Sequence, residues 1–210
     1  MSQTPTTTDP QPTTSSKSKP PPPSVPFNKA PIVKIDSEAL TSLVPRRHVV
    51  SVLAIDPSNV TGIVVIRCPL KPDSKPSIVT AADYLLAKIH PPSKRLLELN
   101  RQLTNLIEHH RIDLIIIEDI FYKGLVNTFR YLSQMRGAIM LTAAAHRLPI
   151  ISINNRRAKK VVAEDGNATK LDMQLAIEGL SGIEGLTEAQ SDALALFYTF
   201  MLVPEHFEKL

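Results

Sequence analysis

The stretch Asp113-Leu-Ile-Ile-Ile-Glu118-Asp119-Ile-Phe121-Tyr122 decides the fold. It runs from apolar residues directly into two carboxylates and two aromatic side chains. A short apolar run of this kind is typical of a strand inside a sheet that is covered on both faces. In α/β proteins the carboxyl end of such a strand is where sites are built. The stretch by itself also fits a buried strand that merely meets water at Glu118, but Asp56 and Asp192 stand in similar settings and favour a site.

The composition describes a chain that can bury a sizeable core without a disulfide. Its 210 residues are 43% hydrophobic, and Cys68 is the only cysteine. A single cysteine cannot form an internal disulfide, so the fold suits a reducing compartment. The chain has no run of about 18 uncharged apolar residues and no apolar core of a secretory signal near its N-terminus. We therefore expect no membrane span.

Basic residues gather in one part of the chain. Residues 123–170 hold nine Lys or Arg residues and only two acidic residues, although the net charge of the whole chain is +4. A basic stretch of this kind indicates a polyanionic partner such as nucleic acid. The alternative is a solvated helix face whose counter-charges lie elsewhere in the fold.

Two parts of the chain differ in composition. Residues 1–26 contain eight prolines and eleven Ser or Thr residues, too few apolar groups to offset the entropy of ordering. We expect a disordered tail over residues 1–46, with a plastid-type transit peptide as the alternative. The folded domain is expected over residues 47–210.

The order of expected elements predicts an α/β fold with a mixed five-stranded sheet flanked by helices. Three closely linked strands are expected to be antiparallel, and two strands that follow helices are expected to be parallel additions. The expected strands cover residues 48–55, 63–66, 77–82, 113–118 and 149–153, and the expected helices cover residues 91–110, 126–146, 156–163, 169–178 and 187–201. Thr187 and Gln190 fit a capping box at the start of the last helix. One face of the 126–146 helix is expected to carry the apolar residues Leu125, Phe129, Leu132, Met135 and Ile139.

Carboxylates from distant parts of the chain are expected to converge. Asp56 ends the first strand and Glu118 ends the fourth, so the two meet if these strands are neighbours. Asp192 lies in the second turn of the last helix, with Glu188 on the same helical face. Because such carboxylates repel, we expect Mg²⁺, which takes oxygen ligands. Two such ions about 3.5–4 Å apart can drive phosphodiester cleavage without a covalent nucleophile.

Several motifs resemble the RuvC family, Holliday-junction resolvases with an RNase H-like fold. The similar segments are Leu53–Pro57 with Thr61-Gly62, Ile117–Phe121, Gln134–Gly137, Pro149–Lys170 and Asp192–Ala195, and the resemblance covers about residues 48–203. Five motifs in order at suitable spacing are fairly specific.

The resemblance implies a homodimer that nicks opposed strands of a four-way DNA junction. Asp56, Glu118 and Asp192 would bind two Mg²⁺ ions, with Mn²⁺ as a substitute. Phe121 would push against bases, and Lys159 would approach the scissile phosphate. The 126–146 helix would form much of the dimer interface. The full set of expected DNA contacts is Phe121, Tyr122, Lys123, Arg130, Arg156, Arg157, Lys159, Lys160 and Lys170.

The sequence departs from the family pattern in two places. The loop between Pro57 and Thr61 is one residue shorter. The family also places an acid or a His three residues before the final Asp, where this chain has Ala189. Either Glu188 substitutes for that ligand, or the second metal is held weakly. Asp119 is left out of the catalytic set, because strand alternation turns it away from Glu118.

Two other functions remain as alternatives to the junction endonuclease. One is a catalytically weak or inactive junction-binding protein of the same fold, and the other is an RNase H-like nuclease that acts on RNA or an RNA–DNA hybrid. The family resemblance implies a nucleoid-associated cytoplasmic location, with a plastid or viral setting as the alternatives. A branch-migration helicase is the candidate further partner.

Overall fold

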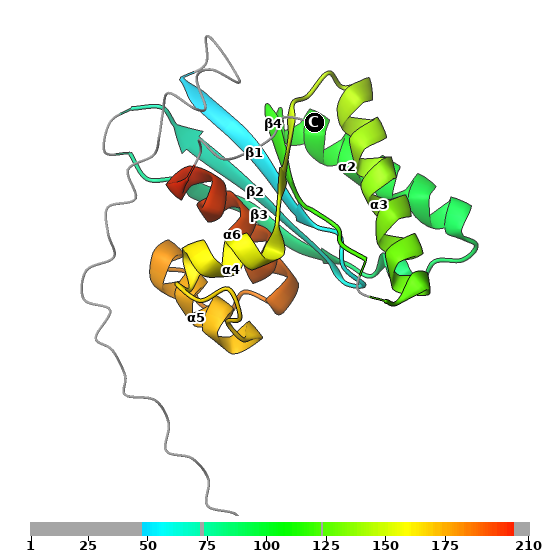
Figure 1. Cartoon of the computed structure of the whole chain (residues 1–210). Coiled ribbons are helices and arrows are strands. Elements are labelled where there is room, and N and C mark those ends of the chain that lie inside the picture. The colour runs from blue at the N-terminus through cyan, green and yellow to red at the C-terminus, as the bar shows by residue number, and fades with distance from the viewer. Residues whose placement is uncertain (1–47, 72–73, 123, 204–210) are drawn as a thin grey trace, which may run out of the picture.

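The computed structural model describes residues 48–71, 74–122 and 124–203 (Figure 1). The expected tail over residues 1–46 and the candidate DNA contact Lys123 lie outside the described residues. The described part forms one five-stranded sheet with the strand order β3-β2-β1-β4-β5. The strands are β1 (Val49–Asp56), β2 (Thr61–Pro69), β3 (Ser77–Tyr84), β4 (Leu114–Glu118) and β5 (Ile150–Ile153).

The sheet is mixed as expected. β1 and β2 are antiparallel, as are β2 and β3. β4 is parallel to β1 and also to β5. The predictions of three antiparallel strands and two parallel additions are therefore confirmed. β1 and β4 are neighbours, which is the condition under which Asp56 and Glu118 were expected to meet.

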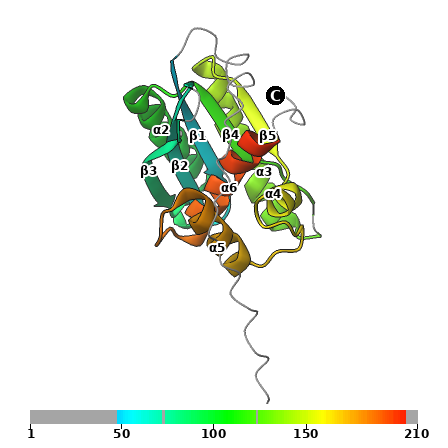
Figure 2. The same cartoon turned by 90° about the vertical axis from the view of Figure 1, so that its left-hand side faces the viewer.

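Helices cover both faces of this sheet (Figures 1 and 2). The helices are η1 (Leu86–Lys88, a 3₁₀ turn), α2 (Pro92–His110), α3 (Val126–Ala145), α4 (Asn155–Val162), α5 (Lys170–Ser181) and α6 (Glu188–Leu202). α2 and α3 pack on one face, here called the α3 face, and α4, α5 and α6 pack on the other, the α6 face. Because β1 is covered on both sides, alternate residues enter different cores, with Ala54 on the α6 face and Leu53 and Ile55 on the α3 face.

α6 is the central helix of the fold. Eleven of its fifteen residues are buried, because β1 and β2 lie on one side of it and α4 and α5 on another. Its start is set by the expected capping box, in which the Thr187 hydroxyl accepts a hydrogen bond from the backbone N–H of Gln190 and the Gln190 side-chain oxygen accepts one from the backbone N–H of Thr187. The helix therefore enters the core at a fixed residue.

Two side chains depart from the amphipathic pattern of their helices. Leu125 was expected on the apolar face of the long helix, but it is the N-cap of α3 and 66% exposed. Arg95 of α2 is charged but buried. Its Nε donates to the Leu86 carbonyl at 3.1 Å, and its guanidinium lies over the Tyr131 ring. The η1 turn accounts for this burial, because it gives the guanidinium a backbone acceptor.

No helix in the described part of the chain is long and apolar enough to cross a membrane.

Candidate active site

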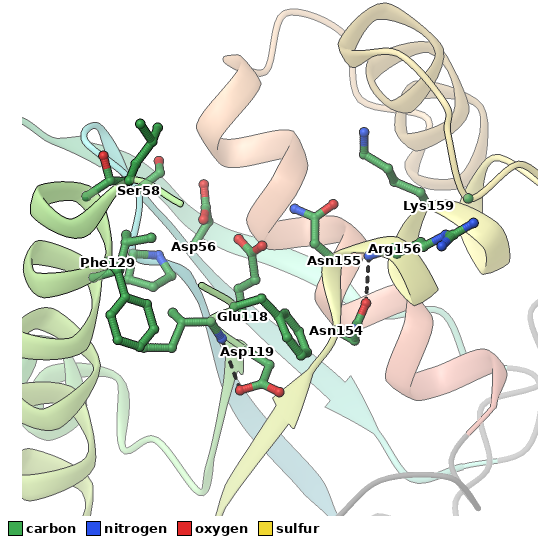
Figure 3. A pocket seen from close by; sticks show the side chains of 16 residues that line it. Asp56, Ser58, Glu118, Asp119, Phe129, Asn154, Asn155, Arg156 and Lys159 are labelled. Carbon is green, nitrogen blue, oxygen red and sulfur yellow. Dashed lines mark hydrogen bonds between the residues drawn. The ribbon is translucent and has the colours of Figure 1, made fainter. Parts of the chain in front are cut away.

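Asp56 and Glu118 lie side by side at the same end of the sheet. β1 and β4 are parallel with Ile55 paired to Ile117, so the next residue of each strand is also adjacent and points to the α6 face. The two carboxyl groups share a hydrogen bond, and Asp56 is only 4% exposed. Figure 3 shows both side chains directed into the same space.

Burial and neighbouring negative charge act on Asp56 in the same direction. Burial is the largest cause that raises the pKa of Asp56 well above its usual range, followed by the hydrogen bond and the charge of Glu118 and by the charge of Asp192. A hydrogen bond with Ser58 lowers the pKa of Asp56 in part. Such a carboxylate is costly to ionise unless a cation is near.

Asp192 approaches this pair from α6. Burial, the largest cause, and the charges of Glu118 and Glu188 raise the pKa of Asp192, Lys170 and Lys159 oppose the shift, and the resulting pKa is about 6. The structure therefore brings all four predicted carboxylates into electrostatic contact. Among the described residues, no group of three or more Asp, Glu, His or Cys side chains is arranged to hold a metal ion. The site is a hydrogen-bonded pair with two further carboxylates close by.

Glu118 and Asp119 point to opposite faces, as strand alternation predicts (Figure 3). Asp119 lies 3.5 Å from the guanidinium of Arg136 on α3. The same guanidinium donates to the Glu118 carbonyl at 3.1 Å and to the Ser152 hydroxyl at 3.0 Å. Arg136 therefore ties the end of β4 to α3 and β5, and it fixes the backbone from which the Glu118 carboxylate extends.

The carboxylate pair opens into a cavity of about 600 Å³. Phe129 lies on one side of it, and Arg156 and Lys159 of α4 lie on the other (Figure 3). Phe121 also lines the cavity. The start of α4 is fixed because Asn154 accepts a hydrogen bond from the Arg156 N–H at 2.8 Å. An apolar wall, a basic wall and a carboxylate pair together suit a nucleic-acid strand whose base contacts the aromatics.

A second cavity of about 350 Å³ also includes Asp56. Its lining includes Lys170, Glu188 and Asp83, and the Lys170 ammonium is paired with the Glu188 carboxylate. Ala189 also lines this cavity. The proposed replacement of the missing ligand by Glu188 stays a prediction, since Glu188 is engaged with Lys170 in this arrangement.

Four of the expected DNA contacts in the described part of the chain do not line either cavity. They are Tyr122, Arg130, Arg157 and Lys160. Tyr122 packs edge-on against Phe129, with ring centroids 5.5 Å apart. Of the two aromatic candidates, Phe121 is thus the one that lines the cavity beside the carboxylates.

Sequence reasoning missed three residues of the site. Ser58, which contacts Asp56, stands in the turn directly after it, so its position was a usable signal. Arg136 lies in the Gln134–Gly137 motif, but no role was assigned to it. Asp83 carried no local signal, because only the pairing of β2 with β3 brings it to this end of the sheet.

A family model described as crossover junction endodeoxyribonuclease RuvC matches residues 52–200. The chain belongs to the RuvC family. The RuvC of Syntrophomonas wolfei is 31% identical over 151 residues, which are 69% of this chain and 84% of that protein. The RuvC of Geotalea uraniireducens is 31% identical over 147 residues, again 69% of this chain and 84% of that protein.

Solved structures of a RuvC protein and of a second Holliday junction resolvase share the fold. Thermus thermophilus RuvC in complex with a Holliday junction substrate aligns with a TM-score of 0.68 and 19% identity, over 78% of this chain and 100% of that chain. The yeast mitochondrial Holliday junction resolvase Ydc2 aligns with a TM-score of 0.54 and 16% identity, over 79% of this chain and 84% of that chain. The RNase H-like fold expected from the sequence motifs is therefore confirmed.

RuvC proteins are divalent-metal-dependent nucleases, and the donor set of this chain fits such an ion. A hard divalent cation is commonly held by one or two carboxylates together with phosphate oxygens of the substrate. Asp56 and Glu118 provide that pair. Their negative charges repel each other, and a bound cation would neutralise those charges. An incomplete protein shell is compatible with this mode of binding, because the substrate completes it.

Proposed function

We propose that this protein is a structure-selective DNA endonuclease that resolves four-way junctions by metal-dependent hydrolysis of one phosphodiester bond in each of two opposed strands. This activity would serve DNA recombination and repair. The observation that carries the proposal is the buried Asp56–Glu118 pair, with Asp192 above it, at the edge of a cavity that has an aromatic wall and a basic wall.

The residues of this chain would divide the chemistry as follows. Asp56, Glu118 and Asp192 would hold two Mg²⁺ ions, for which Mn²⁺ can substitute. When bound, the ions would activate a water and stabilise the leaving oxygen. Lys159 lies at the first cavity and Lys170 at the second, so a strand that crosses the carboxylates would meet an ammonium group on either side. Glu188 is the candidate for the acid that Ala189 lacks, because its charge reaches Asp192.

Phe121 is the proposed base wedge. Half of its surface is exposed, and it lines the cavity beside Glu118 rather than filling the end of the core. Exposed aromatics that stack on unpaired bases are common in proteins that bind single strands. Arg156 on the opposite wall would hold the adjacent backbone.

A homodimer through α3 would place two such sites around a two-fold axis, matching the two equivalent strands of a junction. Gly137 supports this interface. A glycine inside a helix costs about 1 kcal/mol relative to alanine, yet a Cβ at Gly137 would meet nothing within 4 Å. Met140 and Leu141 are exposed beside it. A second α3 helix that approaches closely at Gly137 would explain all three features.

Two further parts of the proposal rest on family resemblance alone. They are a nucleoid-associated cytoplasmic location and a branch-migration helicase as a partner.

The proposal is tested by incubating purified protein with a fluorescently labelled four-way junction and Mg²⁺, beside a linear duplex of the same sequence. We expect symmetric nicks in the junction and none in the duplex. Asp56→Asn should bind the junction with unchanged affinity and cut neither substrate. A panel with RNA and an RNA–DNA hybrid is run in parallel, and preferential cutting of those substrates would replace the junction with a ribonuclease function.

A junction-binding protein without cleavage is the second candidate, and Ala189 is the observation that favours it. If a ligand for the second metal is missing, the protein would bind junctions but cut them slowly or not at all. A titration with Mg²⁺ and then Mn²⁺ distinguishes the two functions. Nicked product at any concentration of either metal, absent in Asp56→Asn, rules out the pure binder.

A further inference from the structure

Asp83 lies at the end of the edge strand β3 and accepts a hydrogen bond from Thr187 at the start of α6. We propose that Asp83 is a positioning residue that sets where α6 begins, and through α6 sets the place of Asp192 relative to Asp56. The test of this inference by junction cleavage rests on the proposed function, whereas its test by the position of α6 is independent of that function.

A row of three residues crosses the sheet at the active-site end. Asp56 of β1 pairs with Gly62 of β2, and Gly62 pairs with Asp83 of β3. Directly paired residues of antiparallel strands point to the same face. The row therefore presents a carboxylate, a gap and a second carboxylate to the α6 face.

The first turn of α6 occupies the gap. A Cβ at Gly62 would lie 1.9 Å from the carbonyl oxygen of Ala189, so no other residue fits there unless α6 moves. The backbone of Ala189 thus rests directly on β2, between the two carboxylates. This contact fixes the distance of the first turn of α6 from the sheet, but a contact at a glycine does not by itself prevent sliding of that turn along the strand.

The Thr187–Asp83 hydrogen bond prevents that sliding. The Thr187 hydroxyl donates to Asp83 Oδ1 at 2.9 Å and accepts from the Gln190 N–H at 3.2 Å. A hydroxyl has one proton, so donation to Asp83 directs its lone pairs toward the helix. Asp83 therefore orients the group that caps α6 and also ties that group to the sheet.

Asp192 depends on this anchor because it lies only five residues after Thr187. Among the described residues its links to the rest of the site are electrostatic, through Glu118, Glu188 and the two lysines. A shift of the first turn of α6 would therefore carry Asp192 away from the Asp56–Glu118 pair. Groups that hold a metal ligand in place are commonly worth about 10–100-fold in activity or metal affinity, and Asp83 would act on Asp192 through the first turn of α6.

The geometry assigns Asp83 to positioning rather than to direct metal binding. Asp56 and Asp83 are separated by an intervening strand, which places their backbones about 9–10 Å apart. Ala189 stands between them on Gly62. Asp83 Oδ1 is also occupied by the Thr187 hydroxyl.

Asp83→Asn and Asp83→Ala separate the two roles. Asparagine keeps the acceptor oxygen and loses the charge, whereas alanine loses both. We expect Asp83→Ala to lower the single-turnover cleavage rate of a four-way junction about 10-fold or more, with junction affinity within about 2-fold of wild type. Asp83→Asn should restore the rate to within about 3-fold of wild type. Thr187→Val should be at least as slow as Asp83→Ala, because it removes the bond to Asp83 and also the cap on the Gln190 N–H. The double variant should be no slower than Thr187→Val, since Asp83→Ala then removes no further interaction with α6.

A structural readout keeps the test independent of catalysis. The ¹H–¹⁵N amide signals of Gln190 and Asp192 should move in Asp83→Ala and Thr187→Val and stay near their wild-type positions in Asp83→Asn. If these signals move as expected while wild type cuts no junction, the anchor stands and the proposed function fails. An Asp83→Asn enzyme as slow as Asp83→Ala, or an Asp83→Ala enzyme as fast as wild type, would overturn the positioning role.

Discussion

Glu118 and Asp119 are adjacent carboxylates at the end of one strand, but they belong to opposite faces of the sheet. Asp119 turns to the α3 face and lies 3.5 Å from the Arg136 guanidinium. Glu118 turns to the α6 face, where its neighbours in the carboxylate cluster are Asp56 and Asp192. The fold thus neutralises the charge on one face and accumulates it on the other.

The difference teaches where to look for function. A buried ionic group on the α3 face, such as Arg95, is satisfied by a backbone carbonyl and an aromatic ring. On the α6 face the burial of Asp56 is accompanied by more negative charge, which raises its pKa further. Local conflicts of this kind persist in natural proteins mainly at functional sites.

The largest expected effect comes from replacing each of the two adjacent acids, Glu118 and Asp119, by its amide. Glu118→Gln should lower the junction-cleavage rate at least about 100-fold, because even residues that only support a metal ligand are worth about 10–100-fold. Asp119→Asn is the matched control, and it should cut within about 3-fold of wild type, since a partly exposed ion pair contributes about 0–1 kcal/mol. The measurement is single-turnover cleavage at saturating Mg²⁺. Equal losses in the two variants would contradict the contrast between the faces.

A smaller effect is expected on assembly through the α3 face. Gly137→Gln should raise the dimer dissociation constant about 10-fold or more, because the added side chain holds two helices apart where small residues allow close approach. Leu171→Gln is the control, since it removes an apolar side chain that is 63% exposed on α5, on the other face. Sedimentation velocity over a dilution series measures both. A Gly137→Gln protein that stays dimeric would exclude this part of α3 from the interface.

The smallest expected effect concerns stability and its dependence on pH. The pKa of Asp192 in the folded chain is about 6, above its ordinary value of 3.8. Folding therefore favours the protonated form of Asp192. The stability contributed by this protonated form is fully present below about pH 4 and is lost as the pH rises through 6. In metal-free protein at pH 7.5, Asp192→Asn should raise the free energy of unfolding by about 1–3 kcal/mol, and the gain should vanish near pH 4.

Asp172→Asn is the matched control for that prediction. The Asp172 carboxylate accepts hydrogen bonds from Thr169 at the start of α5, and these contacts lower the pKa of Asp172. Its replacement should therefore reduce stability at pH 7.5, the opposite sign to Asp192→Asn. Thermal unfolding with and without EDTA measures both variants. A destabilised Asp192→Asn protein at neutral pH would argue against charge accumulation on the α6 face.

The sequence was sufficient to predict the contrast between Glu118 and Asp119. Strand alternation separates neighbouring side chains whatever the tertiary structure is. The directions of the strands were also predictable, because helical crossovers between β-runs imply parallel pairing. The Thr187–Gln190 capping box could be read directly, since it is local and depends on two residues three positions apart.

Features that depend on tertiary pairing could not be predicted in the same way. The Asp83–Thr187 contact joins residues 104 positions apart, and the pairing of β2 with β3 includes a register shift at Val65/Ile66. Leu125 was misplaced because the apolar periodicity of α3 begins one residue before the helix itself does. The burial of Arg95 required the η1 turn, which has no periodic signal.

The burial of α6 has a consequence for motion. A helix enclosed by a sheet and two other helices should exchange its amide hydrogens only when the whole domain unfolds. Phe121 and Tyr122 are 50% and 61% exposed, and backbone at such positions opens far more readily. Asp192 would then be held still on the timescale of turnover, while the aromatic residues beside Glu118 adjust to each junction that arrives.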